Sequence, residues 1–476
     1  MTHDTRNGRN ISDRIAQHYD KLAEKRDAFI EKNQYYYDLL VQYYSYMIPA
    51  GKRILEIGCG TGYLLNALQP CKGVGIDLSG QMILTAAKRY PNLEFHHGTL
   101  NGSNIAGPFD YVILSGTLHE EADIIALLKD ISKVSTPQTR IIIEYYSYLW
   151  QVILKTGERL GLKMPQPLLN WLTHTDIKNF LHLCQIEPVR MERKVLFPVH
   201  FPVLSFLFNR VIANLPFLNA LTLNHFIIAR PLFDPAQEHS VSMIVPARNE
   251  KGNIEAAIQR TPVFGSRQEF IFIEGGSKDG TYEEIERVAA AYPQRNIRYF
   301  KQNGHGKGDA VRLGFSKATG DILMILDADL TVAPEDLPRF YDAIKENKGE
   351  FINGCRLVYP MEKEAMRFLN LVANKFFGIL FSWLVGQKLK DTLCGTKVLF
   401  RTQYEEIARN RDYFGDFDPF GDFDLIFGAS KLNLKITELP IRYKERTYGS
   451  TQIRRFYHGL LLFKMCWFAC RKIKFI

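Results

Sequence analysis

The feature that most constrains the fold is a short apolar segment that runs directly into a glycine turn. Arg53-Ile54-Leu55-Glu56-Ile57 is followed by Gly58-Cys59-Gly60-Thr61-Gly62, and residues 63–68 then have helical character. Glycine tolerates positive φ and carries no Cβ, so the backbone of such a turn can pass close to a ligand that lies over the helix start. The pattern predicts a strand, a glycine turn and a helix, which together are a building unit of α/β folds.

A carboxylate at the end of the next strand narrows the ligand. Residues 73–76 form a second apolar segment that ends at Asp77. This acid lies about 20 residues after the loop, where a carboxylate can accept hydrogen bonds from both ribose hydroxyls. The same arrangement occurs in sites for NAD and for S-adenosylmethionine (SAM), so at this point both cofactors fit.

The string of residues around the turn is more specific. Leu55-Glu-Ile-Gly-Cys-Gly-Thr-Gly62 resembles the class I SAM-dependent methyltransferases, over roughly residues 10–232. The resemblance implies a Rossmann-like fold with further strands at 94–100, 109–115, 139–145 and 224–230. The residues that it implies for SAM binding are Glu56, Gly58, Gly60, Gly62, Asp77, Leu78, Met82, Thr99 and Ser115. Thr99 stands where the family often has an acid that meets the adenine amine.

Three questions about this half stay open. His119, in the loop after the fourth strand, is a general-base candidate, but many methyltransferases act by proximity alone and such a histidine often only packs or caps. The domain is either an active methyltransferase or a non-catalytic binding module. The apolar segment 197–221, interrupted by Arg210, is either a buried cap helix, which we prefer, or a lipid-facing segment.

A connector with prolines and polar residues divides the chain. Residues 230–239 contain Pro231 and Pro235, a composition typical of a short linker. We therefore expect a first domain over residues 1–232, a linker over 233–239 and a second domain over 240–476. Apolar segments at 241–245 and 269–273, with a helical stretch between them, predict a second parallel α/β sheet.

The decisive element of the second domain is an apolar strand that ends in two acids. In the segment 321–329, Asp327 and Asp329 are two residues apart, so alternation along a strand sends their side chains to the same side. Mg²⁺ and Mn²⁺ take oxygen ligands and share their coordination with phosphate oxygens. The pair therefore predicts a metal site that stabilises a departing nucleotide. Lys307, in the glycine-rich segment 303–310, could steady a diphosphate.

Four motifs in order resemble the family 2 GT-A glycosyltransferases, over about residues 240–476. They are Pro246-Ala-Arg-Asn-Glu250, Ser277-Lys-Asp-Gly-Thr281, Gly306-Lys-Gly308 and Asp327-Ala-Asp329. The resemblance implies inverting transfer from a nucleotide-sugar, with Mg²⁺ or Mn²⁺. The donor residues that it implies are Pro246, Ala247, Asn249, Glu250, Glu274, Asp279, Lys307, Ala328 and Arg356. Glu274 and Gly275 stand where the family commonly has two aspartates, so we expect Glu274 alone to contact the base.

Within that family, the segments 352–356, 391–397 and 442–451 resemble dolichyl-phosphate mannose synthases and related polyprenyl-phosphate glycosyltransferases. The likeness implies a polyprenyl phosphate acceptor, a phosphate contact from Arg446 and an amphipathic helix pair over 368–387 at the membrane. Thr331 and Gln452 stand where the mannose synthases usually have Gln and Lys. Residues 453–476 contain six Lys or Arg and no acid, so they either lie in an anionic interface or pack as a basic helix on their own domain.

The acceptor decides whether the reaction needs a base. A polyprenyl phosphate oxygen is ionised near neutral pH, so in-line displacement needs no strong base. A sugar hydroxyl must lose its proton, and Asp391, Asp422 and Asp424 are the candidates, although residues 421–424 could equally form a structural turn. We expect a bifunctional enzyme that makes a lipid-linked sugar and methylates that sugar or a related product.

Composition supplies the remaining expectations. The 60 Lys and Arg against 51 Asp and Glu give a net charge of +9, which suits nucleotides, phosphorylated lipids or an acidic membrane surface. No motif supports nucleic acid as a partner. The seven scattered cysteines argue against a disulfide framework, and neither a signal peptide nor a stretch of about 20 uncharged residues is found. We expect a cytoplasmic protein at the cytoplasmic face of a membrane, in peripheral contact with it.

Overall fold

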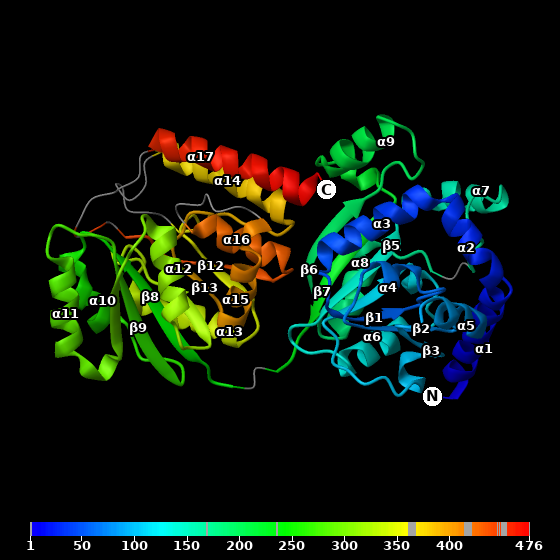
Figure 1. The fold of residues 1–476 in the computed structure, drawn as a ribbon, viewed down its shortest axis with the longest axis horizontal. Coiled ribbons are helices and arrows are strands. Elements are labelled where there is room, and N and C mark those ends of the chain that lie inside the picture. The colour runs from blue at the N-terminus through cyan, green and yellow to red at the C-terminus, as the bar shows by residue number, and fades with distance from the viewer. Residues whose placement is uncertain are drawn as a thin grey trace. The chain divides into compact units, whose positions relative to one another are not determined.

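The chain forms two compact units, each with its own seven-stranded sheet (Figure 1). The computed structural model describes residues 2–167, 170–234, 237–359, 368–413, 421–444, 446, 448 and 455–475. The first unit comprises Met1–Phe233 with Lys474–Ile476, and the second comprises Asp234–Ile473. The division follows Phe233, which lies in the segment expected to be the linker.

The sheet of the first unit is mostly parallel, as the βα pattern predicts. Its strands are β1 (Arg53–Ile57), β2 (Lys72–Asp77), β3 (Glu94–His97), β4 (Tyr111–Ser115), β5 (Arg140–Tyr146), β6 (Ile186–Lys194) and β7 (Asn224–Pro231). Their order is β3-β2-β1-β4-β5-β7-β6, and β7 runs antiparallel to both β5 and β6. Because β1 pairs with both β2 and β4, the strand order reverses at β1, which is where open α/β sheets bind their ligands.

Helices cover both faces of this sheet. They are α1 (Thr2–Asp20), α2 (Ala23–Lys32), α3 (Gln34–Met47), α4 (Tyr63–Ala67), α5 (Gly80–Arg89), α6 (Ile124–Lys133), α7 (Gln151–Arg159) and α8 (His174–Leu183). Leu40, Tyr44 and Met47 of α3 pack on one face against strand residues such as Ile113. Leu128 of α6 packs on the other face. The helical region near the amino end is thus three helices, and its last helix covers the core.

The apolar segment 197–221 differs from the preferred expectation. Residues 204–214 form one continuous helical stretch, made of α9 (Leu204–Phe206), η4 (Leu207–Val211) and η5 (Ile212–Asn214), and η6 (Leu218–Leu221) follows as a separate turn. Many of its large apolar side chains are exposed. The interpretation as a buried cap helix is therefore wrong, because most of the large apolar side chains of this segment are exposed, while Ser205, Asn209 and Asn214 are buried together with Ala213.

The sheet of the second unit carries one reversed strand. Its strands are β8 (Ser240–Ala247), β9 (Arg267–Glu274), β10 (Ile297–Lys301), β11 (Ile322–Ile325), β12 (Phe351–Cys355), β13 (Lys397–Phe400) and β14 (Ile436–Pro440). Their order is β10-β9-β8-β11-β13-β12-β14, with β13 antiparallel to β11 and β12. Since β8 lies between β9 and β11, the order reverses at β8, and the carboxyl ends of β8 and β11 meet at that point.

The helices of the second unit pack around this sheet. They are α10 (Ile254–Arg260), α11 (Thr281–Ala291), α12 (Lys307–Lys317), α13 (Leu337–Lys345), α14 (Phe368–Val385), α15 (Arg401–Arg409), α16 (Asp422–Lys431) and α17 (Arg455–Ala469). The segment expected to be a helix pair is the single helix α14, which lies beside α17 through Phe376, Phe377 and Phe463 (Figure 1). Within the described ranges, no helix combines the length and the apolar character needed to cross a bilayer.

Candidate active sites

A cleft opens in the first unit at the carboxyl ends of β1, β2 and β4. It encloses about 910 Å³ of space between atoms, open solvent included. Seven of the nine residues expected to bind SAM line it: Gly58, Gly60, Asp77, Leu78, Met82, Thr99 and Ser115. The local motif and the sheet order therefore bring the expected residues to one place.

The glycine turn and Asp77 support each other. The backbone N–H of Gly60 donates to Asp77 Oδ2 at 2.8 Å, and that of Ser79 donates to Asp77 Oδ1 at 2.8 Å. Gly58 has a φ of +74°, and a Cβ there would lie 2.5 Å from Thr117 Oγ1. Burial raises the pKa of Asp77. The turn thus holds the carboxylate at the cleft wall, and its oxygens keep lone pairs for a ligand's hydroxyls.

Glu56 and Gly62 lie outside the lining of the cleft. Glu56 is buried, and its Oε2 has no hydrogen-bond partner among the described residues. Burial raises the pKa of Glu56 to about 8. Gly62, with a φ of +77°, begins α4, and a Cβ there would meet the Phe95 ring. Gly62 therefore allows a close approach of the turn to β3.

His119 is also not among the residues that line the cleft. Its ring is 5.7 Å from that of Tyr146 and 5.9 Å from that of Trp171. Both ring nitrogens are buried without a hydrogen-bond partner in the described part of the chain. Burial lowers the pKa of His119 to about 4, so the imidazole is neutral at physiological pH. This environment resembles an aromatic packing site more than the wall of the cleft.

Three lining residues were missed because only tertiary structure brings them to the cleft. Tyr19 of α1, Arg26 of α2 and Glu120 of the loop after β4 all line it. The Tyr19 hydroxyl donates to Glu120 Oε1 at 2.5 Å, and burial raises the pKa of Glu120 to about 7. Arg26 Nη1 donates to the hydroxyl of Tyr37 at 3.0 Å. In the sequence they are ordinary members of polar helices and a loop, without a distinguishing pattern.

In the second unit, the two acids after β11 lie between two cations. Lys307 Nζ is 2.5 Å from Asp327 Oδ1, and Arg446 Nη2 is 2.6 Å from Asp329 Oδ2. Thr331 Oγ1 donates to Asp329 Oδ1 at 2.8 Å. Burial alone would raise the pKa of Asp327, but the adjacent Lys307 ammonium outweighs it and lowers that pKa. The structure thus brings Lys307 and Arg446 to the acid pair, as the motifs predict.

The backbone of the loop 391–397 lies against this acid pair. A Cβ built on Gly395 would fall on Asp327 Oδ2 and on Lys307 Nζ. At the end of β8, Glu250 accepts a hydrogen bond from Asn253 Nδ2 at 2.7 Å. Burial raises the pKa of Glu250 to about 7, and the charge of Asp329 adds to this shift. Residues 250, 327, 329 and 395 therefore belong to one site.

The expected donor residues at the ends of β8 and β9 bind each other. Asn249, at a φ of +55°, donates its N–H to Ser277 Oγ at 2.9 Å and accepts from Lys278 N at 2.9 Å. Glu274 Oε1 accepts from Ser277 N at 2.5 Å. Asp279 Oδ1 accepts from the Thr281 hydroxyl at 2.5 Å, and Asp279 Oδ2 accepts from the Tyr448 hydroxyl at 3.2 Å. Of the other expected donor residues, Pro246 and Ala247 end β8 and Ala328 follows β11, and both alanines are buried.

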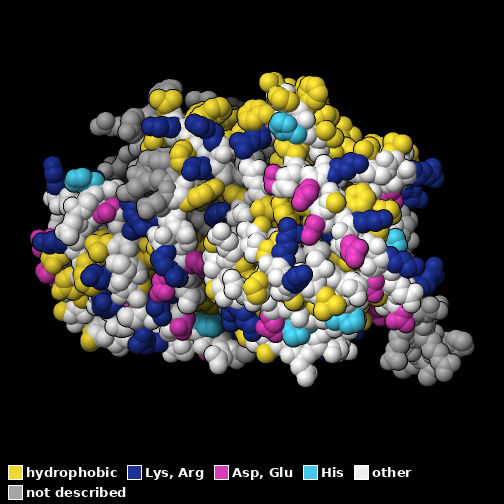
Figure 2. Space-filling model, turned by 45° about the vertical axis from the view of Figure 1, so that its right-hand side comes forward, with side chains coloured by type: hydrophobic (Ala, Val, Ile, Leu, Met, Phe, Trp, Pro, Cys, Tyr) yellow, Lys and Arg dark blue, Asp and Glu magenta, His cyan; other side chains and the backbone are white. Residues whose placement is uncertain are grey.

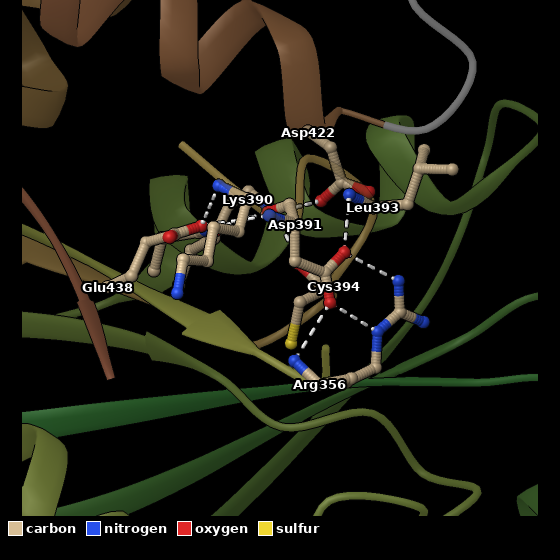
Figure 3. Close-up of polar contacts among 9 residues, drawn as sticks. Arg356, Lys390, Asp391, Leu393, Cys394, Asp422 and Glu438 are labelled. Atoms are coloured by element: carbon tan, nitrogen blue, oxygen red, sulfur yellow. Dashed lines mark hydrogen bonds and ion pairs between the residues drawn. The ribbon is translucent and has the colours of Figure 1, made fainter. Parts of the chain in front are cut away.

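Arg356 and Asp391 form a bidentate ion pair (Figure 3). Arg356 Nε is 2.7 Å from Asp391 Oδ2, and Nη2 is 2.8 Å from Oδ1. Asp391 is 0% exposed, and its N–H donates to Glu438 Oε1 at 2.9 Å. Burial opposes ionisation of Asp391, but the Arg356 guanidinium outweighs it and holds its pKa below the usual range. Both side chains, one expected at the diphosphate and one as a base, are engaged with each other.

The other two base candidates are also paired. Asp422 Oδ1 lies 2.7 Å from Nζ of the fully buried Lys397, and Asp424 Oδ2 lies 2.8 Å from Arg411 Nε. No cluster of three or more His, Cys, Asp or Glu side chains suited to a metal occurs in the described residues. Asp327 and Asp329 would offer a metal two carboxylates, and phosphate or water would supply further oxygens. Gln452 lies outside the described residues.

Comparison with known proteins assigns the two halves to families. Residues 29–189 match the family described as Methyltransferase domain, and residues 242–411 match Glycosyl transferase family 2. The chain is 33% identical over 222 residues to Dolichol-phosphate mannosyltransferase from Pyrococcus furiosus, which covers 45% of this chain and 59% of that protein. It is 25% identical over 225 residues to Undecaprenyl-phosphate 4-deoxy-4-formamido-L-arabinose transferase from Salmonella paratyphi B, which covers 46% of this chain and 64% of that one.

The chain therefore spans about three fifths of the length of these curated relatives. Likeness to solved structures is weaker. Glucosyl-3-phosphoglycerate synthase from Mycobacterium tuberculosis, in complex with uridine-diphosphate, is 21% identical over 49% of this chain and 80% of that one, with a TM-score of 0.37. From the family matches and the two sheets, the chain carries a methyltransferase domain followed by a domain of glycosyl transferase family 2.

Proposed function

We propose that the second unit transfers a sugar from a nucleotide-sugar to a polyprenyl phosphate, with inversion at the anomeric carbon. The observation that carries this proposal is the acid pair at the carboxyl end of β11, held between Lys307 and Arg446. The names of both curated relatives include a polyprenyl phosphate acceptor, which supports the same acceptor class here. We place the reaction at the cytoplasmic face of a membrane, where such a lipid phosphate would be presented.

The acid pair fits a hard divalent cation. Asp327 and Asp329 offer carboxylate oxygens, the ligand type that Mg²⁺ and Mn²⁺ prefer. A metal held by them would supply charge neutralisation for the leaving diphosphate. Lys307 and Arg446, which pair with these acids, would turn to the diphosphate oxygens and stabilise the same developing charge.

The acceptor chemistry agrees with the pairing of the base candidates. Asp391, Asp422 and Asp424 each have a cationic nitrogen within 2.8 Å, and these ion pairs occupy carboxylate oxygens that a general base would need. A phosphate acceptor needs none of them as a base, because its oxygen is already ionised. That oxygen attacks the anomeric carbon as the bond to the diphosphate breaks. We therefore propose that Asp391 holds Arg356 in place. Arg356 would then be a third cation at the diphosphate, with Lys307 and Arg446.

We further propose that the first unit binds SAM and methylates the transferred sugar or a related product. The cleft suits the cofactor, since Asp77 would accept hydrogen bonds from the ribose hydroxyls and Arg26 would face the carboxylate of the methionine part. Glu120, with its pKa near 7 and its place in the lining, is better situated than His119 to take a proton from a methyl acceptor. The alternative is a binding module without turnover. SAM binding without any methyl transfer to lipid-linked products would favour that alternative.

One experiment tests the transferase proposal. Nucleotide-sugars are screened with Mn²⁺ and undecaprenyl phosphate, using wild type, Asp329→Ala and the control Asp336→Ala, whose half-buried carboxylate pairs with Arg339. Asp329→Ala should lower transfer by about 100-fold or more, while the control keeps the wild-type rate. Calorimetry should show unchanged SAM affinity in all three proteins. Equal transfer by wild type and Asp329→Ala would remove the acid pair from the mechanism.

A further inference from the structure

The segment 197–221 of the first unit has its polarity inverted. It contains no Asp, Glu or Lys, and its one arginine is Arg210. The apolar side chains on its outer surface are Val199, Phe201, Val203, Leu204, Phe206, Leu207, Leu215, Phe217, Leu218 and Leu221, all exposed. The side chains of Ser205, Asn209 and Asn214 are buried. Figure 2 shows hydrophobic side chains gathered over the α9 region at its upper edge.

Specific hydrogen bonds fix this inverted arrangement. Asn209 Oδ1 accepts from the N–H groups of Leu196 and Phe197, both at 2.8 Å, and its Nδ2 donates to the Tyr35 hydroxyl at 3.1 Å. Asn214 Oδ1 accepts from Lys194 Nζ at 2.8 Å. Each buried polar group thereby satisfies its hydrogen-bonding needs. The outward position of the apolar side chains is therefore a consequence of the polar anchors beneath them.

The two most exposed of these side chains sit at the tips of matching turns. Val203 is 78% exposed and Phe217 is 91% exposed. Each follows a proline and has a positive φ, 67° and 69°, closed by a hydrogen bond from the next residue's N–H to the proline carbonyl at 2.7 and 2.9 Å. Such positive-φ γ-turns are rare and strained, and strain of this kind persists where the structure holds a functional geometry.

The charges around the surface select its occupant. Trp150 Nε1, just before α7, donates to the Leu221 carbonyl at 2.8 Å, so the start of α7 adjoins the segment and extends it with the exposed Val152 and Ile153. Lys155 and Arg159 of α7 are exposed, whereas its only acid, Glu158, is neutralised by Lys163 at 2.8 Å. An apolar surface with cations and no free acid on these two elements matches the interface of an anionic bilayer.

We propose that residues 197–221 and the start of α7 form a membrane-insertion surface on the methyltransferase unit, with Val203 and Phe217 as its inserted tips and an anionic phospholipid bilayer as its occupant. None of the residues 197–221 lines the cleft that is proposed to bind SAM, so the two features are separate. It would deliver the methyltransferase unit to substrates carried by lipids. The proposal does not depend on the metal chemistry of the second unit.

Hydrogen–deuterium exchange of the full chain tests it, with vesicles of phosphatidylcholine alone or containing about 30% phosphatidylglycerol. We expect the anionic vesicles to protect residues 197–221. The double variant Val203→Asn/Phe217→Asn should lower the vesicle partition coefficient about tenfold or more, since two large apolar side chains leave the bilayer. Asparagine adopts positive φ more readily than Val or Phe, so the variant relieves both turns instead of straining them.

Val263→Asn is the matched control, because Val263 is 80% exposed in the second unit, and it should bind vesicles like wild type. Asp329→Ala should also bind them like wild type, which separates this proposal from the transferase chemistry. Absence of vesicle-dependent protection in 197–221 would overturn the proposal, as would unchanged binding by the double variant. Protection of the segment that rises with protein concentration in the absence of lipid would overturn it in favour of a second copy as occupant.

Discussion

Replacing Asp391 by asparagine tests how the second unit holds Arg356. The carboxylate accepts from Nε at 2.7 Å, Nη2 at 2.8 Å and the backbone N–H of Arg356 at 3.0 Å (Figure 3). Asparagine keeps the shape but removes the charge and points an amide at guanidinium donors. Removing one partner of a buried ion pair costs about 3–5 kcal/mol, because the other charge stays buried without compensation.

This cost translates into a large shift of thermal stability. For a unit of this size, each kcal/mol lowers Tm by roughly 2–4 °C, so Asp391→Asn should lower the Tm of the second unit by about 6–20 °C. Calorimetry of the full chain measures it, and retained SAM binding reports an intact first unit. The pKa of Asp391 is depressed, so its stabilising effect is present at neutral pH. That effect is lost only as the pH falls through this lowered pKa, and the difference between the two proteins should shrink there.

Glu335→Gln supplies the matched control. Glu335 receives the same two-pronged contact from Arg260, at 2.8 and 3.0 Å, but the side chains are 51% and 36% exposed. Exposed pairs are worth at most about 1 kcal/mol, so this variant should lose no more than a few degrees. If both variants lost the same stability, burial would not decide the strength of the Arg356 pair and the reasoning would fail.

Three further predictions concern the two sites. Gly395→Ala should abolish sugar transfer while SAM binding persists, because the added Cβ would clash with Asp327 Oδ2 and with Lys307 Nζ. Transfer above about a tenth of the wild-type rate would contradict this close approach. Glu56→Gln should stabilise the first unit relative to wild type, and this gain should grow from pH 5 to 8.5. Burial raises the pKa of Glu56 to about 8, so ionisation of Glu56 in the unfolded chain lowers the stability of the wild type as the pH rises through this interval. A Tm difference that is constant with pH argues against it. Arg26→Met should weaken SAM binding about tenfold in calorimetry by removing a charge-assisted contact, whereas Arg14→Met on α1, outside the lining residues, should not; equal affinities would exclude the proposed carboxylate contact.

Much of the architecture could be predicted because its determinants are local. A strand, a glycine turn and a helix occupy consecutive residues at 53–68, and the acid pair follows its own strand directly, so strand alternation alone predicts that the side chains of Asp327 and Asp329 share one side. Residues this close in the sequence stay close together in space, regardless of how the rest of the chain folds. The sequence by itself therefore determined two α/β units, the glycine turn and the acidic strand end.

Only the tertiary structure decided which distant side chains complete each site. Arg446 contacts Asp329 although more than 100 residues separate them in the chain. Both oxygens of Asp391 accept hydrogen bonds from Arg356, so Asp391 is not a free base. Tyr19 and Glu120 line the cleft proposed for SAM, while the neighbouring His119 packs among aromatic rings. These outcomes depend on strand order and on the path of loops, which no local pattern encodes.

The segment 197–221 shows the same limit for surfaces. Its composition predicts burial, since apolar side chains gain free energy on leaving water. The folded chain instead buries Asn209 and Asn214, because they form hydrogen bonds there with partners such as Tyr35 and Lys194. Which face of a segment turns inward depends on the polar groups that other elements present to it, and only the assembled tertiary structure brings those groups into place.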